Sequence, residues 1–367
     1  MRRARCVVLE AIGDPVAVRE VEVDPPVPEP GGLVASVEYG GVCGTDVHLQ
    51  AGRLPIPVPL VLGHEGVGRV EVLGEGSDRD ALGAPLSVGD PITWASSIAC
   101  GTCFFCRDAQ EPTLCERRRI YGITRPLGVA PHLTGSWAEK IQLEPGTTVV
   151  RLDDRLRAEA VIALGCAGPT VVHGLLHVMP VRPGESVVVQ GAGPVGLAAA
   201  MYAHLAGARP VVVIGAPAAR LELAGQLGIG EERFDIDRLD ADERLERVQA
   251  LTWGRGADVV VECTGVPAAV SEALELARPG GRVLVLGQYT DHGATPLNPH
   301  LITRKQLRVL GSWAFSAGHY VEYVLTLPQL AARFSVERLI TMFPLERAQD
   351  ALDAARGGAV GKAVLVP

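Results

Sequence analysis

A glycine-rich turn constrains the fold of this chain more than any other segment. It runs from Gly191 to Gly196 (G-A-G-P-V-G), between an apolar segment at 185–190 and a helical pattern at 197–206, and a second apolar segment follows at 210–214. In this context G-x-G-x-x-G predicts a β-α-β unit, whose glycines admit a pyrophosphate that the helix N-terminus stabilises. The alternative is a glycine turn that only packs a helix against a strand. The expected dinucleotide contacts are Gly191, Gly193, Pro194, Val195 and Gly196.

The strand and helix patterns continue beyond this turn. Apolar segments at 233–236, 258–262 and 282–287 alternate with helical patterns at 218–227 and 268–277. This alternation predicts a doubly wound parallel sheet and therefore an α/β fold. Thr264 and Gln288 follow two of these segments and Gly287 ends one of them, and we expect all three to contact the cofactor as well.

The first third of the chain has a different pattern of apolar and polar residues. Residues 6–37 alternate apolar and polar side chains around a proline-rich turn at 24–32, and 67–72 alternates again, which predicts short antiparallel strands. A helix at 317–332 and a strand at 363–366 return to this first domain. A length of 367 residues and 47% hydrophobic residues suit two domains. The expected segments are 1–160 with a lobe at 95–120, 161–308, and 309–367.

Charge and hydropathy exclude several classes of function. A net charge of -8 argues against nucleic acid as the main partner. No stretch reaches the roughly 18 apolar residues of a membrane span, and the start runs directly into a strand-like segment without a signal peptide. We therefore expect a cytoplasmic protein. The one basic cluster, Arg117 to Arg119, is either a solvated loop or an anion-recruiting patch.

Four of the eight cysteines lie within sixteen residues, with the spacing C-x2-C-x2-C-x8-C. Four thiolates can fill a tetrahedral shell around one zinc ion, which is the geometry of a structural site. Free buried thiols are one alternative. An iron–sulfur cluster is another, although its fourth cysteine usually follows after three residues and precedes proline. The expected ligands are Cys100, Cys103, Cys106 and Cys115.

A second set of reactive side chains lies between residues 41 and 68. Cys43 and His64 are metal ligands of the type that zinc prefers, and a catalytic zinc is typically held by three protein groups with one position open. The segment therefore lacks a third ligand. Its other reactive groups are Thr45, Asp46, His48 and Glu65.

Four motifs occur in a recognisable order: G-V-C-G-T-D-V-H, G-H-E-G-V-G, the four-cysteine lobe and G-A-G-P-V-G after a strand. In these motifs the chain resembles the zinc-containing alcohol dehydrogenases of the medium-chain dehydrogenase/reductase superfamily. The resemblance spans nearly the whole chain. It implies a GroES-like β-rich catalytic domain, completed by the C-terminal return, and an inserted Rossmann domain.

The resemblance also assigns roles to individual residues. It makes Cys43, His64 and Cys166 the ligands of a catalytic zinc, although Cys166 lies in a short Gly-Cys-Ala-Gly context and some polyol-specific relatives use glutamate there. Glu65 is similar to an acid beside the zinc, and Asp46 to the carboxylate that orients the histidine ligand. Two catalytic roles remain. Thr45 would contact the substrate, and His48 would form the far end of a proton relay. The alternative for His48 is a surface histidine without a catalytic role.

The implied activity is hydride transfer between an alcohol, such as a secondary alcohol or polyol, and NAD(P). Zinc would polarise the oxygen, and the cofactor would accept or donate the hydride. The resemblance further implies two zinc ions per chain, a small alcohol or carbonyl substrate, and a homodimer or homotetramer. Charge and hydropathy argue against a nucleic-acid or membrane partner. The alternative is a non-catalytic dinucleotide-binding or structural protein of the same fold.

Three segments depart from the family pattern. Gly215 and Ala216 stand where an acid that binds the adenosine ribose is expected, and Arg220 is the next cation, so the sequence leans toward NADP. The eight-residue gap in the cysteine lobe is one residue longer than usual, which predicts a bulged turn at 108–112. The loop at 117–135 matches poorly and could border the substrate cleft.

Overall fold

The computed structural model describes residues 3–23, 27–153 and 155–367. Residues 24–26 of the expected proline-rich turn lie outside this range. The chain divides into two compact units. Unit 1 consists of Met1–Cys166, Ser316–Gln329 and Val336–Pro367, and unit 2 of Ala167–Phe315 and Leu330–Ser335.

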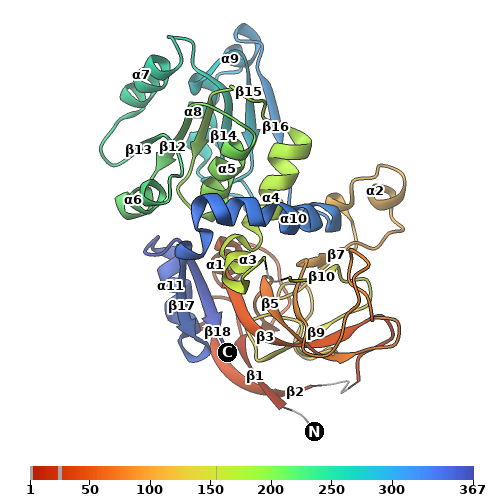
Figure 1. Cartoon of the computed structure of the whole chain (residues 1–367). Coiled ribbons are helices and arrows are strands. Elements are labelled where there is room, and N and C mark those ends of the chain that lie inside the picture. Colours follow the sequence, from red (N-terminus) through yellow and green to blue (C-terminus); the bar gives the residue numbers. More distant parts are fainter. Residues whose placement is uncertain (1–2, 24–26, 154) are drawn as a thin grey trace. The chain divides into compact units, whose positions relative to one another are not determined.

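Unit 2 is built on a six-stranded sheet in which every neighbouring pair is parallel (Figure 1). The strand order is β13-β12-β11-β14-β15-β16, so the chain crosses over between its third and fourth strands. A ligand site is expected at such a crossover, beyond the carboxyl ends of the strands. The strands are β11 (Val187–Gln190), β12 (Val211–Gly215), β13 (Glu232–Asp235), β14 (Ala257–Glu262), β15 (Ala277–Val285) and β16 (Arg308–Gly311).

Helices connect these strands and bury their apolar faces. Helix α5 packs on β11 and β12, and α8 packs on β14 and β15. Val260 and Leu274 are fully buried in the core between sheet and helices. The helical segments are α4 (Ala167–Val171), the π-helix η2 (Val172–Val178), α5 (Pro194–Leu205), α6 (Ala218–Gln226), α7 (Ala241–Leu251), α8 (Pro267–Leu276) and α9 (Pro299–Arg304).

The predicted parallel sheet is confirmed, with two shifted boundaries. Helix α5 begins at Pro194 rather than at 197, because proline is well suited to the first helical position, where no N–H bond is needed. Strand β15 was expected at 282–287 but runs from Ala277 to Val285. Its early part pairs Ala277 with Ala257 before a shift in register, and sequence periodicity does not reveal such a pairing.

Unit 1 is dominated by antiparallel strands. A seven-stranded sheet has the order β10-β6-β5-β3-β18-β17, with β9 also paired to β3. Its strands are β3 (Leu33–Val42), β5 (Gly66–Leu73), β6 (Pro91–Trp94), β9 (Lys140–Leu143), β10 (Val149–Arg151), β17 (Ile340–Pro344) and β18 (Lys362–Val366). Smaller sheets contain β1 (Arg3–Leu9), β2 (Ala17–Glu22) and β4 (Leu60–Val61), and β7 (Ser97–Ile98) with β8 (Arg119–Ile120).

The C-terminal strand completes this sheet. Strand β18 lies antiparallel to β3, with Ala363 opposite Val42 and Val364 opposite Gly41. The last strand of the chain is therefore paired with a strand from its first fifty residues. The helical segments of unit 1 are α1 (Gly44–Gln50), α2 (Phe104–Arg107), η1 (Pro112–Leu114), α3 (Ala158–Leu164), η3 (Val336–Leu339), η4 (Leu345–Arg347) and α11 (Ala348–Arg356), and α10 (Ala317–Phe334) is divided between the units.

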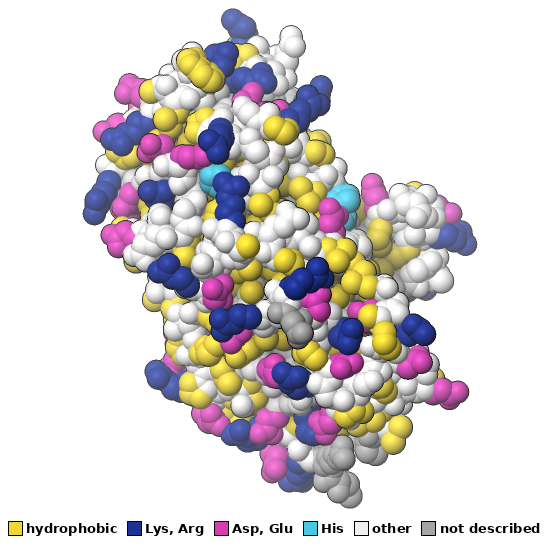
Figure 2. Space-filling view, in the orientation of Figure 1, with side chains coloured by type: hydrophobic (Ala, Val, Ile, Leu, Met, Phe, Trp, Pro, Cys, Tyr) yellow, Lys and Arg dark blue, Asp and Glu magenta, His cyan; other side chains and the backbone are white. Residues whose placement is uncertain are grey.

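The surface mixes charges of both signs. Figure 2 shows basic and acidic side chains interspersed over the visible face, with hydrophobic side chains between them. Among the described residues no single helix is long and apolar enough to cross a membrane. One pair of consecutive helices, Ala158–Leu164 and Ala167–Val178, has the combined length and apolar composition of a membrane span, but the two helices are bent by 53° relative to each other.

Candidate functional site

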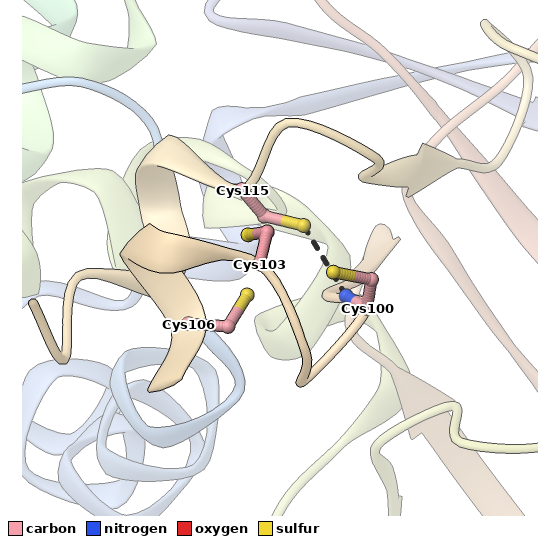
Figure 3. Close-up of side chains that lie close together, drawn as sticks. All are labelled: Cys100, Cys103, Cys106 and Cys115. Atoms are coloured by element: carbon pink, nitrogen blue, oxygen red, sulfur yellow. Dashed lines mark hydrogen bonds between the residues drawn. The ribbon is translucent and has the colours of Figure 1, made fainter. Parts of the chain in front are cut away.

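The four clustered cysteines converge in a small lobe of unit 1 (Figure 3). Cys103 precedes α2, Cys106 lies within it, and Cys115 follows η1. The four sulfur atoms lie within 4.8 Å of one another, and the backbone N–H of Cys100 donates to Cys115 Sγ at 3.2 Å. Such a set of sulfur atoms fits a closed tetrahedral metal shell.

Local donors stabilise negative charge in this lobe. The backbone N–H of Thr102 contributes most to lowering the pKa of Cys100 to about 5, and Arg117 Nη2 also lies 3.6 Å from its sulfur. The backbone N–H of Glu116 lowers the pKa of Cys103, whereas desolvation raises the pKa of Cys106 to about 12. Several thiolates at this spacing require a cation, so the donors present fit a metal ion.

Two features of the lobe concern residues outside the ligand set. Arg117 donates to Thr102 Oγ1 at 2.6 Å as well as to Cys100, so the arginine run contributes to the lobe, a role that the sequence did not reveal. The longer gap contains Gln110 in a left-handed conformation, with φ 58, just before η1. A residue in this conformation turns the chain sharply within the segment 108–112.

A second metal-binding set brings together residues distant in the sequence. Cys43, His64, Glu65 and Cys166 each place one ligand atom within 4.8 Å of the others. Cys43 precedes α1, His64 and Glu65 lie between β4 and β5, and Cys166 follows α3. The sulfur atoms of Cys43 and Cys166 are 3.3 Å apart. The structure thus brings a second thiol, that of Cys166, to the two candidate ligands of the segment 41–68.

Asp46 holds two of these segments together. It is fully buried, and its Oδ2 accepts the backbone N–H of Cys43 at 2.8 Å while its Oδ1 lies 3.2 Å from His64 Nδ1. A carboxylate at Nδ1 leaves Nε2 of the ring for a metal.

The charges in this site favour a cation. Burial opposes protonation of His64, but Asp46 and Cys43 together raise its pKa well above the usual value. The contact with Cys166 contributes most to lowering the pKa of Cys43, and the same contact raises the pKa of Cys166. Two thiols and an imidazole that lie this close together fit a divalent cation bound between them.

Helix α1 carries the two remaining candidates. Thr45 and His48 are three residues apart and therefore lie on the same face of the helix, and both are half-buried. Thr45 Oγ1 lies 3.8 Å from Cys43 Sγ. The hydroxyl of Thr45 therefore lies beside the metal-binding set, and the imidazole of His48 lies one helical turn from Thr45.

Lys362 is a charged neighbour of this set that sequence analysis did not identify. Its Nζ donates to Glu65 Oε2, and both side chains are 2% exposed. The available signal was a lysine that opens an otherwise apolar closing strand, Ala363 to Val366. A buried lysine of this kind requires a charged partner, but the sequence alone does not say which.

The glycine-rich turn of unit 2 has the backbone geometry of a phosphate-binding loop. Gly191 has φ +121, and a Cβ added at Gly196 would lie 1.9 Å from Gly191 O. Gly193 precedes α5, whose twelve residues begin with Pro194 and Val195. The free N–H groups at such a helix start can bind an anion.

The second strand of the unit ends in a closely packed glycine. A Cβ at Gly215 would lie 2.8 Å from both N and Cβ of Ala192 in the glycine-rich turn. Arg220, in the first turn of α6, reaches toward that turn, since its Nη1 would lie 3.8 Å from a Cβ at Gly193. Burial lowers the pKa of Arg220. Ala216, next to Gly215, is half-buried.

The other expected cofactor residues meet around a buried acid. Glu262, at the end of β14, is fully buried, and its Oε1 accepts the backbone N–H groups of Thr264 and Gly265 at 2.6 and 2.9 Å. Gln288 Nε2 donates to its other oxygen at 3.3 Å, and a Cβ at Gly287 would lie 2.4 Å from Gly265 N. Glu262 was not singled out from the sequence, although an acid that ends a buried valine strand is a recognisable signal.

The loop at 117–135 covers a cavity of about 260 Å³ in unit 1. Arg119 and Arg125 both contact Glu144 there, and Tyr121 is buried with its hydroxyl 2.5 Å from Thr147 Oγ1. The lining contains none of the candidate metal ligands; it consists of Ile98, Arg119, Ile120, Tyr121, Thr124, Arg125, Pro126, Val129, Thr134 and Glu144.

Comparison with known proteins gives consistent matches. Residues 29–154 match the alcohol dehydrogenase GroES-like domain, and residues 194–329 match the zinc-binding dehydrogenase domain. The 5-exo-hydroxycamphor dehydrogenase of Pseudomonas putida is 36% identical over 340 residues, which is 92% of each chain.

Two solved structures share the whole fold. An alcohol dehydrogenase from Thermotoga maritima superposes with a TM-score of 0.93, at 33% identity over 100% of both chains. A zinc-binding dehydrogenase from Sinorhizobium meliloti 1021, bound to NADP, gives a TM-score of 0.85 at 28% identity, again over 100% of both chains.

The contacts of Asp46 predict a specific defect. In Asp46→Asn the carboxylate opposite His64 is lost, and we expect metal affinity at the Cys43 set to fall by about 10- to 100-fold. Competition with a chromogenic chelator measures this affinity. Asp78→Asn makes the same chemical change at an exposed position and should have no effect. Equal affinities for the two variants would contradict the role of Asp46.

Proposed function

Since the chain belongs to the zinc-containing alcohol dehydrogenase family of the medium-chain dehydrogenase/reductase superfamily, we propose that unit 1 is its catalytic domain and unit 2 its dinucleotide domain. The protein is a dehydrogenase that transfers a hydride between an alcohol and a nicotinamide cofactor. Two joins between the units lie at 166/167 and 315/316, six and seven residues beyond the expected boundaries at 160 and 308. The convergence of Cys43, His64 and Cys166 is the observation that carries the catalytic assignment.

The residues of unit 1 have distinct proposed roles. Cys43, His64 and Cys166 hold the catalytic zinc, and Asp46 fixes the orientation of His64. The zinc ion, when bound, supplies a Lewis acid for the alcohol or carbonyl oxygen. Thr45 binds that oxygen and exchanges its proton, and His48, on the same face of α1, passes the proton outward.

The second proposed zinc has a structural role. Cys100, Cys103, Cys106 and Cys115 would fill all four positions, so no site is left for substrate. We therefore propose two zinc ions per chain. None of the eight cysteines forms a disulfide among the described residues, and we propose a reducing cytoplasm as the compartment.

For the substrate we propose a secondary alcohol or polyol, or the corresponding carbonyl compound. The support is the 36% identity to a dehydrogenase named for a hydroxylated camphor. A non-catalytic dinucleotide-binding protein is the alternative, and the presence of Thr45 and His48 beside an intact ligand set favours the enzyme.

The proposal predicts coupled loss of metal and activity. A panel of alcohols and carbonyls, followed by nicotinamide absorbance, should show turnover by the wild-type protein. Cys43→Ala should abolish it and lower the zinc content from about two to about one per chain, because one ligand of the open shell is missing. Metal analysis and cofactor titration complete the measurement, and cofactor binding should persist.

The matched control is Cys6→Ala, which removes a buried thiol from the core of unit 1. It should retain both metals and most of the activity. Turnover by Cys43→Ala would overturn the catalytic assignment, and a wild-type protein with no turnover on any compound would support the non-catalytic alternative.

We further propose a preference for NADP. At the end of β12, Gly215 carries no carboxylate that would repel a 2′-phosphate, and its contact with Ala192 leaves no room for one. Arg220 lies close enough to the glycine-rich turn to pair with such a phosphate. The other expected contacts, from Thr264, Gly287 and Gln288, lie around Glu262 and do not distinguish the two cofactors.

Arg220→Gln should therefore raise the KM for NADP by about tenfold and change the KM for NAD much less, because only NADP loses a charge-assisted contact. Steady-state kinetics with both cofactors measures this. Arg238→Gln, at an exposed arginine of the same unit, is the control. A preference of about a hundredfold for NAD in the wild type would refute the proposal.

The outer strand of unit 2 supports a homo-oligomer. All four residues of β16 are exposed, and Val309 and Leu310 remain 36% and 41% exposed. Proteins usually cover an apolar sheet edge of this kind. We propose that β16 pairs with its copy in a twofold dimer, and two such dimers would give the tetramer that the family resemblance also allows.

Leu310→Glu should shift the protein toward monomers, because a carboxylate would be buried in the pairing of the two strands. Light scattering coupled to size exclusion measures the mass. Leu82→Glu, at a position that is 50% exposed in unit 1, should keep the wild-type mass. A wild-type monomer would contradict the proposal.

A further inference from the structure

The ion pair between Lys362 and Glu65 is unusual because it is almost completely buried. Each side chain is 2% exposed, and Lys362 Nζ donates to Glu65 Oε2. Glu65 Oε1 is buried without a hydrogen-bond partner. One oxygen of the same carboxylate also lies within 4.8 Å of the ligand atoms of Cys43, His64 and Cys166. The carboxylate thus lies beside the metal-binding set, and the lysine is the hydrogen-bond partner of one of its oxygens.

Two glycines define the space in which this carboxylate lies. A Cβ at Gly41 would lie 2.0 Å from Glu65 Oε2, and a Cβ at Gly165 would lie 2.2 Å from the same atom. The two glycines come from β3 and from the residue before Cys166. We call the space between them the glycine slot. Any side chain at either position would displace the carboxylate.

The strand pairing brings the lysine to this slot. Lys362 opens β18, and the following residues, Ala363 and Val364, pair with Val42 and Gly41 of β3. The pairing of β18 with β3 therefore places the ammonium group of Lys362 beside Glu65, the residue that follows the proposed ligand His64. Because both groups are buried, loss of either leaves an uncompensated charge in the interior.

Lys362 offsets part of the negative charge of this buried set. The thiolates of Cys43 and Cys166 and the carboxylates of Glu65 and Asp46 carry four negative charges, and a divalent cation with Lys362 carries three positive charges. Without Lys362 the excess negative charge rises from one to two. The Glu65 carboxylate would then lower its energy by moving to the cation, which has an open position in a three-ligand shell.

We propose that Lys362 is a positioning residue that holds the Glu65 carboxylate in the glycine slot and so keeps the fourth coordination position of the metal open for substrate. The inference rests on the proposed zinc ligands Cys43, His64 and Cys166. It assigns a role in metal chemistry to the last strand of the chain, far in sequence from every ligand.

Cobalt provides a test that does not depend on turnover. The protein with Co²⁺ in place of zinc is titrated with imidazole, and the visible absorption bands of the metal are followed. The four-cysteine shell has no open position, so imidazole reports on the other site. Lys362→Met should need at least about tenfold more imidazole than the wild type, because Glu65 fills the open position.

Three further variants separate this role from a structural one. Lys362→Met combined with Glu65→Gln should return to the wild-type imidazole response, since the competing carboxylate is gone. Gly41→Ala, which displaces the carboxylate while Lys362 is retained, should resemble Lys362→Met. Lys362→Arg should resemble the wild type. Circular dichroism and cobalt content establish that each variant is folded and loaded, and the double variant tests the role even where Lys362→Met does not fold.

Two results would overturn the inference. One is a folded Lys362→Met protein with two cobalt ions and the wild-type imidazole response. The other is a double variant whose imidazole response is as weak as that of Lys362→Met, or absent. A wild-type protein that holds only one cobalt ion, insensitive to imidazole, would instead refute the proposed catalytic metal, and with it the role of Lys362.

Discussion

The buried carboxylate of Asp46 connects the segments on which the site depends. It accepts the N–H of Cys43 and lies opposite Nδ1 of His64, so it fixes the start of α1 relative to the loop between β4 and β5. A buried carboxylate is costly unless such contacts compensate it. The position of Thr45 and His48 follows from the same contact, because both belong to the helix that Asp46 anchors. One acidic side chain thus sets the geometry of a ligand and of the adjacent hydroxyl.

The two metal-binding sets stabilise negative charge in different ways. In the lobe, backbone N–H groups and Arg117 surround the sulfur atoms, and the ligands come from sixteen consecutive residues. In the other set the ligands come from three separate segments, and the neighbouring charges are the buried side chains of Asp46 and Lys362. The four cysteines of the lobe can fill all four positions of a tetrahedral shell, as a structural ion requires. The three proposed ligands of the other set would leave one position open.

Much of this structure follows from patterns within short segments. The valine strand before Gly191 and the alternation that follows it predict the parallel sheet, and the spacing of Cys100 to Cys115 predicts a sulfur cluster. Lys362 was not predicted because strand pairing sets its partner, Glu65. Glu262 accepts N–H groups from the turn two and three residues later, so its signal was local and was overlooked. The start of β15 at Ala277 was not predicted, because a shift in strand register leaves no periodic signal in the sequence.

The contact between Gly215 and Ala192 links two properties of the dinucleotide site. Any side chain at 215 would meet the backbone of the turn that is expected to receive the pyrophosphate. A carboxylate therefore cannot be introduced at this strand end unless the glycine-rich turn moves first. A substitution at 215 that alters the preferred cofactor would therefore also disturb the turn proposed to bind the diphosphate that both cofactors share.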